Sequence, residues 1–474
     1  MTPDTLDVPK HVAELRAAQP DWEALGVRGR VRWVRRYADW LLDNADRITE
    51  ILASEGGKPL VEAKIEFAVP VDIIKYYARN AEKYLRPNHP APPNLLNRAK
   101  RVTVTHRPYP VVAVITPWNF PLGLSLMDSI PALLAGAAVV VKPAPATPGA
   151  VRAAVEGWAE IGAPPVFSVI AEGDDAGRAL VEEADYIQFT GSTEVGRKIA
   201  QRCGERLIPY GLELGGKDPA IVLADADLDH AARGIAWGAL ANAGQMCTSV
   251  ERVYVLDTVH DEFLAKLTAH VRGLRRDSDV GPLVTEDQFA LVSGQLDDAR
   301  AAGARVMVGG GTDPERRWIE PTVLAEVDST MACVCAETFG PLIPVIRVSS
   351  EDEAVAAANA TDYGLSASIW TSDRRHGAHL AARLEAGAVN INDAHANIFY
   401  FTAPMDGWKN SGMGGRLGGA AGILKYTRPQ TVTKPRVSVS YQRHLLWYPY
   451  TRKRTELVGR LLRALAATGR RRLG

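Results

Sequence analysis

At 474 residues the chain is too long for one compact core, so two or three domains are expected. Lys and Arg number 55, as do Asp and Glu, and this balance gives the chain as a whole no attraction to nucleic acid. Four cysteines are too few for a disulfide framework and none has the spacing of a zinc site, so we expect a cytoplasmic protein that binds no metal. Residues 1–7 contain no apolar segment, and no signal peptide is expected.

Apolar residues recur at helical spacing from Trp22 to about Leu85, and Gly56-Gly57-Lys58-Pro59 should divide this region into two long helices. Proline and asparagine then predict a loop over 87–97. The longest apolar run, 131–141, is about half of the ~20 residues that a membrane span needs. It is typical of a buried helix end that leads into a buried strand.

Strands and helices alternate through the rest of the chain. Strands are expected at 102–105, 111–115, 138–141, 167–170 and 186–190, and helices at 151–161, 176–183 and 195–203. Apolar runs joined by helical crossovers predict a parallel, doubly wound sheet. A second α/β series should run from Pro219 to about residue 425, with a late strand at 431–433. On a strand, Cys333 and Cys335 would share one face.

Small and polar residues surround Cys247 in the segment Gly244–Arg252. A cysteine buried for packing alone usually has larger apolar neighbours, whereas this setting leaves room for a substrate carbonyl. Inert cysteines are nevertheless more common than nucleophilic ones, so the segment alone does not decide between the two.

Four further motifs have a chemical interpretation and a structural alternative. Gly191 and Gly196 flank a strand-to-helix turn whose N–H groups could approach phosphates, although the spacing is not GxGxxG and a tight turn would also need glycine. Glu213 lies between two leucines before a Gly-Gly turn, a setting that could desolvate it and make it a general base, although a surface carboxylate with apolar neighbours is the more common case for such a local pattern. Asn119 in Pro117–Pro121 could stabilise an oxyanion or simply pack, and Glu337–Pro341 could be a loop with a stacking aromatic.

In their joint order these motifs resemble the aldehyde dehydrogenase superfamily, and the resemblance covers roughly residues 25 to 435. The motifs that carry it are Pro117–Pro121, Lys142-Pro143, Gly191–Gly196, Glu213–Lys217, Gln245-x-Cys247, Glu337–Pro341, 387–392 and 409–414. The resemblance implies an α/β, aldehyde dehydrogenase-like fold. Its parts would be a modified Rossmann domain over 1–85 and 109–215, a catalytic domain over 216–427, an oligomerisation arm over 86–108 and 428–441, and a basic amphipathic tail over 442–474. The arm would build a homodimer or a homotetramer.

The resemblance also implies a role for each matching residue. Cys247 would attack the aldehyde to give a thiohemiacetal, which loses a hydride to the nicotinamide and becomes a thioester. Asn119 and the backbone N–H of Cys247 would form the oxyanion hole, and Glu213 would activate the water that hydrolyses the thioester. The residues that would bind NAD or NADP are Trp118, Lys142, Gly191, Ser192, Gly196, Glu337 and Phe339.

The chain departs from the family pattern at two positions that bear on cofactor and substrate. Pro145 replaces a glutamate that often accepts hydrogen bonds from the adenine ribose, so NADP should be tolerated. The chain looks closest to bacterial succinate-semialdehyde dehydrogenases, yet it has Met127 where some of them have an arginine for the substrate carboxylate. An apolar or small neutral aldehyde therefore fits better, with the semialdehyde as the alternative. A CoA-acylating enzyme is disfavoured by Glu213, and an inactive binding protein by the intact Cys247, Glu213 and Asn119.

The tail over 445–472 follows the family least. Aromatic residues precede Arg452-Lys453-Arg454, and a helical segment with leucines on one face follows. Such a pattern is typical of peripheral contact with a membrane surface, or of a helix that packs on protein and keeps a solvated basic end.

Overall fold

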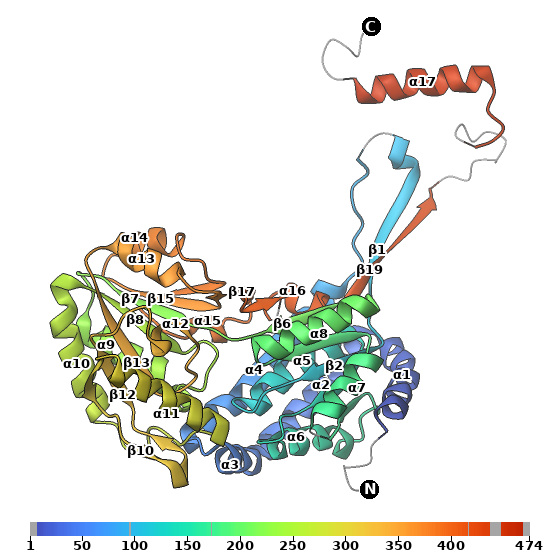
Figure 1. The fold of residues 1–474 in the computed structure, drawn as a ribbon. Coiled ribbons are helices and arrows are strands. Elements are labelled where there is room, and N and C mark those ends of the chain that lie inside the picture. Colours follow the sequence, from blue (N-terminus) through green and yellow to red (C-terminus); the bar gives the residue numbers. More distant parts are fainter. Residues whose placement is uncertain (1–6, 94–95, 172, 416, 437–446, 468–474) are drawn as a thin grey trace. The chain divides into compact units, whose positions relative to one another are not determined.

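The computed structural model describes residues 7–93, 96–171, 173–415, 417–436 and 447–467 (Figure 1). The chain forms two compact units. One comprises Met1–Tyr84 with Pro108–Thr427, and the other comprises Leu85–Arg107 with Arg428–Gly474. The larger unit contains two extended sheets, which are taken in turn.

The first sheet has six strands in the order β18-β6-β5-β2-β3-β4. Their bounds are β2 Val111–Ile115, β3 Ala138–Lys142, β4 Phe167–Val169, β5 Tyr186–Thr190, β6 Tyr210–Glu213 and β18 Gly412–Met413. All neighbours are parallel except β18 and β6. Every residue of β2, β3 and β5 is buried, because helices cover both faces of a parallel sheet.

Two groups of helices cover this sheet (Figure 1). One group contains α1 Val8–Ala24, α7 Asp174–Glu183 and α8 Thr193–Arg206, and the other contains α2 Gly26–Asp43, α5 Pro121–Ala135 and α6 Gly149–Glu160. Two further helices, α3 Ala45–Gly56 and α4 Leu60–Leu85, complete the N-terminal region.

The second sheet has seven strands in the order β16-β15-β7-β8-β13-β12-β9, and only β9 runs antiparallel to its neighbour. The strands are β7 Asp218–Val222, β8 Val250–Leu256, β9 Arg305–Val308, β12 Thr322–Ala325, β13 Leu342–Val348, β15 Ser366–Trp370 and β16 Ala388–Ile391. One apolar core lies under α9 Leu228–Leu240, α10 His260–Arg272 and α11 Glu286–Ala301. A separate core lies under α13 Glu351–Asn359 and α14 Arg374–Ala381.

Short elements connect these layers. They are η3 Ala241–Gly244, η4 Asp257–Val259, β10 Thr312–Asp313, η5 Pro314–Arg316, β11 Trp318–Ile319, α12 Ala332–Cys335, β14 Tyr363–Gly364, α15 Ala396–Phe399, β17 Trp408–Lys409 and α16 Ala421–Leu424. The smaller unit contains η2 Leu96–Ala99, the paired strands β1 Lys100–Pro108 and β19 Thr427–Pro435, and the helix α17 Arg452–Ala466. Among the described residues, no helix is both long enough and apolar enough to cross a membrane.

The predicted doubly wound α/β architecture is confirmed, and the late strand at 431–433 lies within β19. Two predictions are wrong. The region from Trp22 to Gly57 is not one helix: it contains the end of α1 and the separate helices α2 and α3. The chain breaks at Gly26, which has a φ of +64°, and again at Asn44, whose side chain caps the carbonyl of Trp40. Cys333 and Cys335 lie on the short helix α12, where the first is buried and the second is exposed.

The domain boundaries stay predictions. The strand β18 belongs to the segment assigned to the catalytic domain, yet it pairs with β6 of the first sheet. The tail residues 445–446 and 470–472 lie outside the described residues.

Candidate active site

The loop after β2 carries Asn119, which is 2 % exposed. Its side-chain Nδ2 donates to the carbonyl of Gln245 over 3.0 Å. Its own carbonyl accepts from Lys58 Nζ at 2.7 Å and from Asn242 Nδ2 at 3.0 Å. The loop is therefore fixed from the N-terminal helices and from the segment that contains Cys247.

A buried ion pair between Lys58 and Glu66 holds this loop in place. Lys58 Nζ lies 2.6 Å from Glu66 Oε2, and both side chains are 1 % exposed. Glu66 Oε1 also accepts the N–H groups of Leu122 and Gly123 at the start of α5. Breaking a buried pair leaves an uncompensated charge and costs about 3–5 kcal/mol. No sequence motif predicts this pair, because Lys58 belongs to the Gly56-Gly57-Lys58-Pro59 helix break and Glu66 to an ordinary amphipathic helix.

Cys247 follows the end of α9 and the short turn η3. Gly244 in that turn has a φ of +74°, and a Cβ there would lie 2.3 Å from the carbonyl of Gly340. Ser249 Oγ donates to the carbonyl of Ala239, which ties the start of β8 to the end of α9. The cysteine is half-buried. Cys247 lines two cavities with different chemistry.

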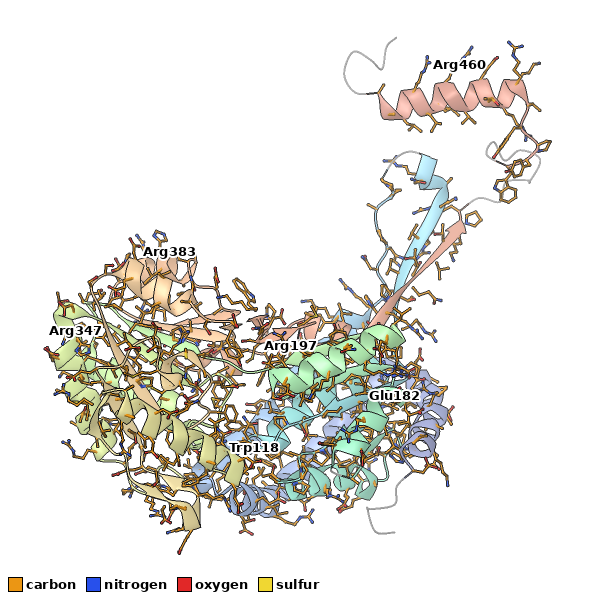
Figure 2. The ribbon with its side chains drawn as sticks, in the orientation of Figure 1. Trp118, Glu182, Arg197, Arg347, Arg383 and Arg460 are labelled. Carbon is orange, nitrogen blue, oxygen red and sulfur yellow. The ribbon has the colours of Figure 1, made fainter. Side chains whose placement is uncertain are left out.

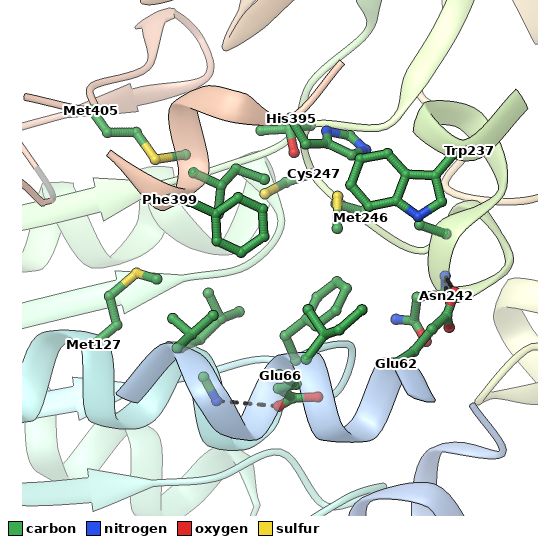
Figure 3. Close-up of a pocket in the computed structure, with 18 residues that line it drawn as sticks. Glu62, Glu66, Met127, Trp237, Asn242, Met246, Cys247, His395, Phe399 and Met405 are labelled. Atoms are coloured by element: carbon green, nitrogen blue, oxygen red, sulfur yellow. Dashed lines mark hydrogen bonds between the residues drawn. The ribbon is translucent and has the colours of Figure 1, made fainter. Parts of the chain in front are cut away.

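The first cavity is apolar and contains about 900 Å³ of space, open solvent at its mouth included. Figure 3 shows Cys247 beside Met246, with Trp237 on α9 and Phe399 on α15 to either side and Met127 on α5 across the cavity. The apolar lining residues are Ile65, Val69, Phe120, Leu124, Met127, Trp237, Met246, Ile398, Phe399 and Met405.

The ionisable groups of this cavity carry no positive charge. Burial lowers the pKa of His395 to about 4, so its ring is neutral near pH 7. Burial also raises the pKa of Glu62, whose carboxylate accepts the N–H of Asn242. Neither Lys nor Arg occurs among the described residues that line it. Asp128, next to Met127, does not line the cavity. Its carboxylate accepts hydrogen bonds from Lys425 Nζ and from the hydroxyl of Tyr426.

The second cavity lies beyond the carboxyl end of β5. Seven of the predicted site residues line it, namely Trp118, Asn119, Gly191, Ser192, Cys247, Glu337 and Phe339. The other three lie outside both linings. Lys142 is buried at the end of β3, Glu213 is buried at the end of β6, and Gly196 packs within α8 against Leu214.

The turn from β5 to α8 presents backbone groups to the second cavity. Ser192 caps α8, a helix of 14 residues, and its side chain accepts the N–H of Val195. The N–H of Gly191 donates to the carbonyl of Glu213, which links the turn to the end of β6. A Cβ at position 191 would lie 2.5 Å from the ring of Phe189. A bare turn at a helix N-terminus favours a bound anion.

Glu337 faces this turn from the other sheet. Burial and the nearby Glu251 raise its pKa to about 7, and its Oε1 accepts the N–H of Gly216 over 3.0 Å. Glu251 in turn accepts from Lys217 Nζ and from the N–H groups of Thr338 and Phe339. This buried pair fixes the loop that carries Glu337, and the sequence analysis gave Glu251 no role.

Aromatic rings close one side of the second cavity. The rings of Trp118 and Phe339 meet edge to face with centroids 5.6 Å apart. No group of three or more His, Cys, Asp or Glu side chains within the described ranges could hold a metal ion.

Comparison with known proteins agrees with this arrangement. The model of the aldehyde dehydrogenase family matches residues 3–432. A protein of Mycolicibacterium smegmatis, provisionally named as an NADP(+) succinate-semialdehyde dehydrogenase, is 45 % identical over 442 residues, covering 91 % of this chain and 85 % of its own length. The 4,4'-diapolycopene aldehyde oxidase of Methylomonas sp is 36 % identical over 451 residues, covering 94 % of this chain and 84 % of its own length.

Solved structures agree with the sequence comparison. The Mycobacterium tuberculosis aldehyde dehydrogenase complexed with NAD+ superposes with a TM-score of 0.85 at 32 % identity, with 90 % of each chain covered. The fold predicted from the motifs is therefore confirmed. The chain belongs to the aldehyde dehydrogenase family.

Proposed function

We propose that this protein oxidises apolar aldehydes to carboxylic acids, with NAD or NADP as the electron acceptor. The observation that carries the proposal is the position of Cys247, which lines both the apolar cavity and the polar one. A substrate held in the first cavity and a cofactor held in the second would meet at the same thiol.

The chemistry follows from the groups around Cys247. Its thiolate attacks the carbonyl carbon, and the developing oxyanion accepts from Asn119 Nδ2 and from the N–H of Cys247. Nδ2 of Asn119 has two N–H donors: one donates to the carbonyl of Gln245, and the other would donate to the oxyanion. Loss of a hydride leaves a thioester, and a water molecule that gives a proton to Glu213 hydrolyses it. The sum is aldehyde, NAD(P)+ and water giving acid, NAD(P)H and a proton.

The residues that line the second cavity, together with Lys142 and Gly196 outside its lining, fit a dinucleotide. Gly191 and Ser192 would hold the diphosphate at the N-terminus of α8, Lys142 and Glu337 the two ribose units, and Trp118 and Phe339 the nicotinamide side, while Gly196 lets α8 pack. When bound, the nicotinamide accepts the hydride of the substrate. Pro145 is exposed and has no carboxylate to repel a 2′-phosphate, so both NAD and NADP are proposed.

Cofactor binding should depend on pH through Glu337. Its carboxylate accepts ribose hydroxyls when ionised, and with a pKa of about 7 it is protonated below that pH and charged above it. The KM of the cofactor should therefore fall severalfold between about pH 6 and pH 8. The Glu337→Gln variant should have a higher KM with a flat profile. A variant that keeps the wild-type pH profile would assign the titration to another group.

The apolar cavity supports the substrate class. A substrate carboxylate placed among Met127, Phe399 and Trp237 would lose its water without gaining a cationic partner. An alkyl or polyene chain would instead gain roughly 25 cal/mol for each Å² of its surface that is buried. The Methylomonas relative, named for a diapolycopene aldehyde, is consistent with a long apolar substrate.

We expect kcat/KM for decanal to exceed that for succinic semialdehyde by at least about a hundredfold, because an unpaired buried carboxylate costs several kcal/mol. The reaction should yield one acid per reduced cofactor without CoA. Steady-state kinetics of both aldehydes with both cofactors, and chromatography of the product, test this. A preference for succinic semialdehyde would overturn the substrate class, and a strict need for CoA would overturn hydrolysis.

Succinate-semialdehyde oxidation is the second candidate, favoured by the name of the Mycolicibacterium relative. This candidate is disfavoured because the described residues that line the first cavity include no Lys or Arg to pair with the carboxylate of the substrate. A CoA-acylating reaction fits less well, since Glu213 is present as the base for water.

We also propose that the enzyme works in the cytoplasm as a homodimer or homotetramer. The strands β1 and β19 of the arm would form the contact between subunits. The first sheet would serve as the cofactor domain and the second as the catalytic domain.

A further inference from the structure

The overall charge balance of the chain conceals a strong segregation. The smaller unit, residues 85–107 and 428–474, contains 17 Lys and Arg residues and one acidic residue, Glu456. The rest of the chain contains 38 Lys and Arg against 54 Asp and Glu. The smaller unit is therefore strongly cationic while the larger one is anionic. The family match ends at residue 432, so most of the cationic tail lies beyond it.

The helix α17 separates its side chains into two arcs, with the exception of Arg454, which falls within the apolar arc at the first turn. Leu457, Val458, Leu461, Leu462 and Leu465 follow the spacing of one helical face. At about 100° per residue they cover an arc of about 140°. The opposite arc carries Arg452, Lys453, Glu456, Arg460 and Arg463. Figure 2 labels Arg460 on this helix.

None of the residues of α17 is buried: Leu457 and Leu462 of the apolar arc are exposed, and Val458, Leu461 and Leu465 are half-buried. Leu457 is 45 % exposed and Leu462 is 57 % exposed. Three aromatic side chains just before the helix are exposed as well, Trp447 at 54 %, Tyr448 at 81 % and Tyr450 at 61 %.

Arg454 links the aromatic residues to the helix. Its guanidinium donates to the carbonyls of Trp447 and Pro449, which holds this segment against the first turn. The segment and the helix thus form one local element, named here the tail element (residues 447–466).

We propose that the tail element docks on an anionic phospholipid surface. A bilayer supplies a complement for each of its parts: phosphates for the basic arc, acyl chains for the leucine arc, and the polar–apolar boundary for Trp and Tyr. A nucleic acid could engage the basic arc and the aromatic rings, but it would leave the leucine arc without an apolar partner. If the proposed substrate class holds, docking brings the enzyme to the phase in which apolar aldehydes dissolve.

The full-length protein is sedimented with phosphatidylcholine vesicles that contain or lack phosphatidylglycerol. Binding is expected only to the anionic vesicles, and it should weaken with added salt. The Arg460→Gln/Arg463→Gln variant should bind about 25-fold more weakly, because each basic residue near such a surface contributes about fivefold. The Leu457→Gln/Leu461→Gln variant should bind at least about tenfold more weakly, since glutamine keeps the helix but not the apolar arc.

The matched control is Arg178→Gln/Arg275→Gln. It removes two exposed arginines of the larger unit and should bind vesicles like the wild type. Absence of binding, or equal binding by all variants, would overturn the proposal. A change in the oligomeric mass of the Leu457→Gln/Leu461→Gln variant in the absence of lipid would also overturn it, because the apolar arc would then contact a second copy of the chain. Binding of a DNA oligonucleotide, without binding of vesicles, would overturn it as well. The sedimentation assay does not require catalytic turnover. A protein that binds vesicles but oxidises no aldehyde would therefore contradict the proposed reaction and leave the membrane proposal intact.

Discussion

The Cys247→Ala variant should lose turnover by about 10⁴-fold or more while it binds the cofactor within about twofold of the wild type. The thiol is the only group at the junction of the two described cavities that can form the covalent intermediate. Its removal shortens a half-buried side chain without changing the turn at Gly244. Absorbance of the reduced cofactor measures turnover, and quenching of protein fluorescence measures cofactor binding.

Cys203→Ala is the matched control for this variant. Cys203 lies buried on α8, and burial raises the pKa of its thiol to about 11, so it stays protonated near neutral pH. The control should keep near wild-type kcat. Turnover that survives in Cys247→Ala, or an equal loss in both variants, would contradict the assignment of the nucleophile.

The Glu213→Gln variant should acylate normally and deacylate about 10²–10⁴-fold more slowly. Glutamine keeps the shape of a side chain that is 3 % exposed. The bond from the N–H of Gly191 to the carbonyl of position 213, and the strand pairing that places this residue opposite Gly412, do not depend on the side-chain charge. The loss should therefore fall on the activation of water. Stopped-flow mixing should give one rapid equivalent of reduced cofactor per site, followed by a slow steady state.

Glu194→Gln controls for the loss of a carboxylate near the cofactor turn. Glu194 is exposed on α8 and pairs with Lys198, so its removal should leave both phases unchanged. A steady state at the wild-type rate without a burst in Glu213→Gln would show that another group activates the water.

Buried parallel strands could be predicted from the sequence because both of their faces are apolar. The segments 111–115 and 186–190 were predicted in full as β2 and β5. Breaks between amphipathic helices could not be found in the same way. Neither Leu25 nor Asn44 interrupts the apolar period, and Gly26 acts through its backbone conformation alone.

Some residues of the candidate site could be predicted from the sequence and others could not. Cys247, Glu213 and Asn119 carry short motifs, so their identity and order could be recognised. The groups that hold them in position carry no local signal. Lys58 contacts Asn119 across 61 residues, and Glu251 reaches Phe339 across 88 residues. The lack of a cation around Met127 emerges only when four separate helices, α4, α5, α9 and α15, are brought around one cavity.

The central claim is that Cys247 carries an apolar acyl group during turnover. The most direct measurement mixes Glu213→Gln with decanal and NADP+, quenches the mixture with acid and identifies the modified peptide by mass spectrometry. We expect a decanoyl thioester on Cys247, and no thioester when succinic semialdehyde replaces decanal at the same concentration. An unmodified Cys247, an acyl group on another residue, or a succinyl group alone would contradict it.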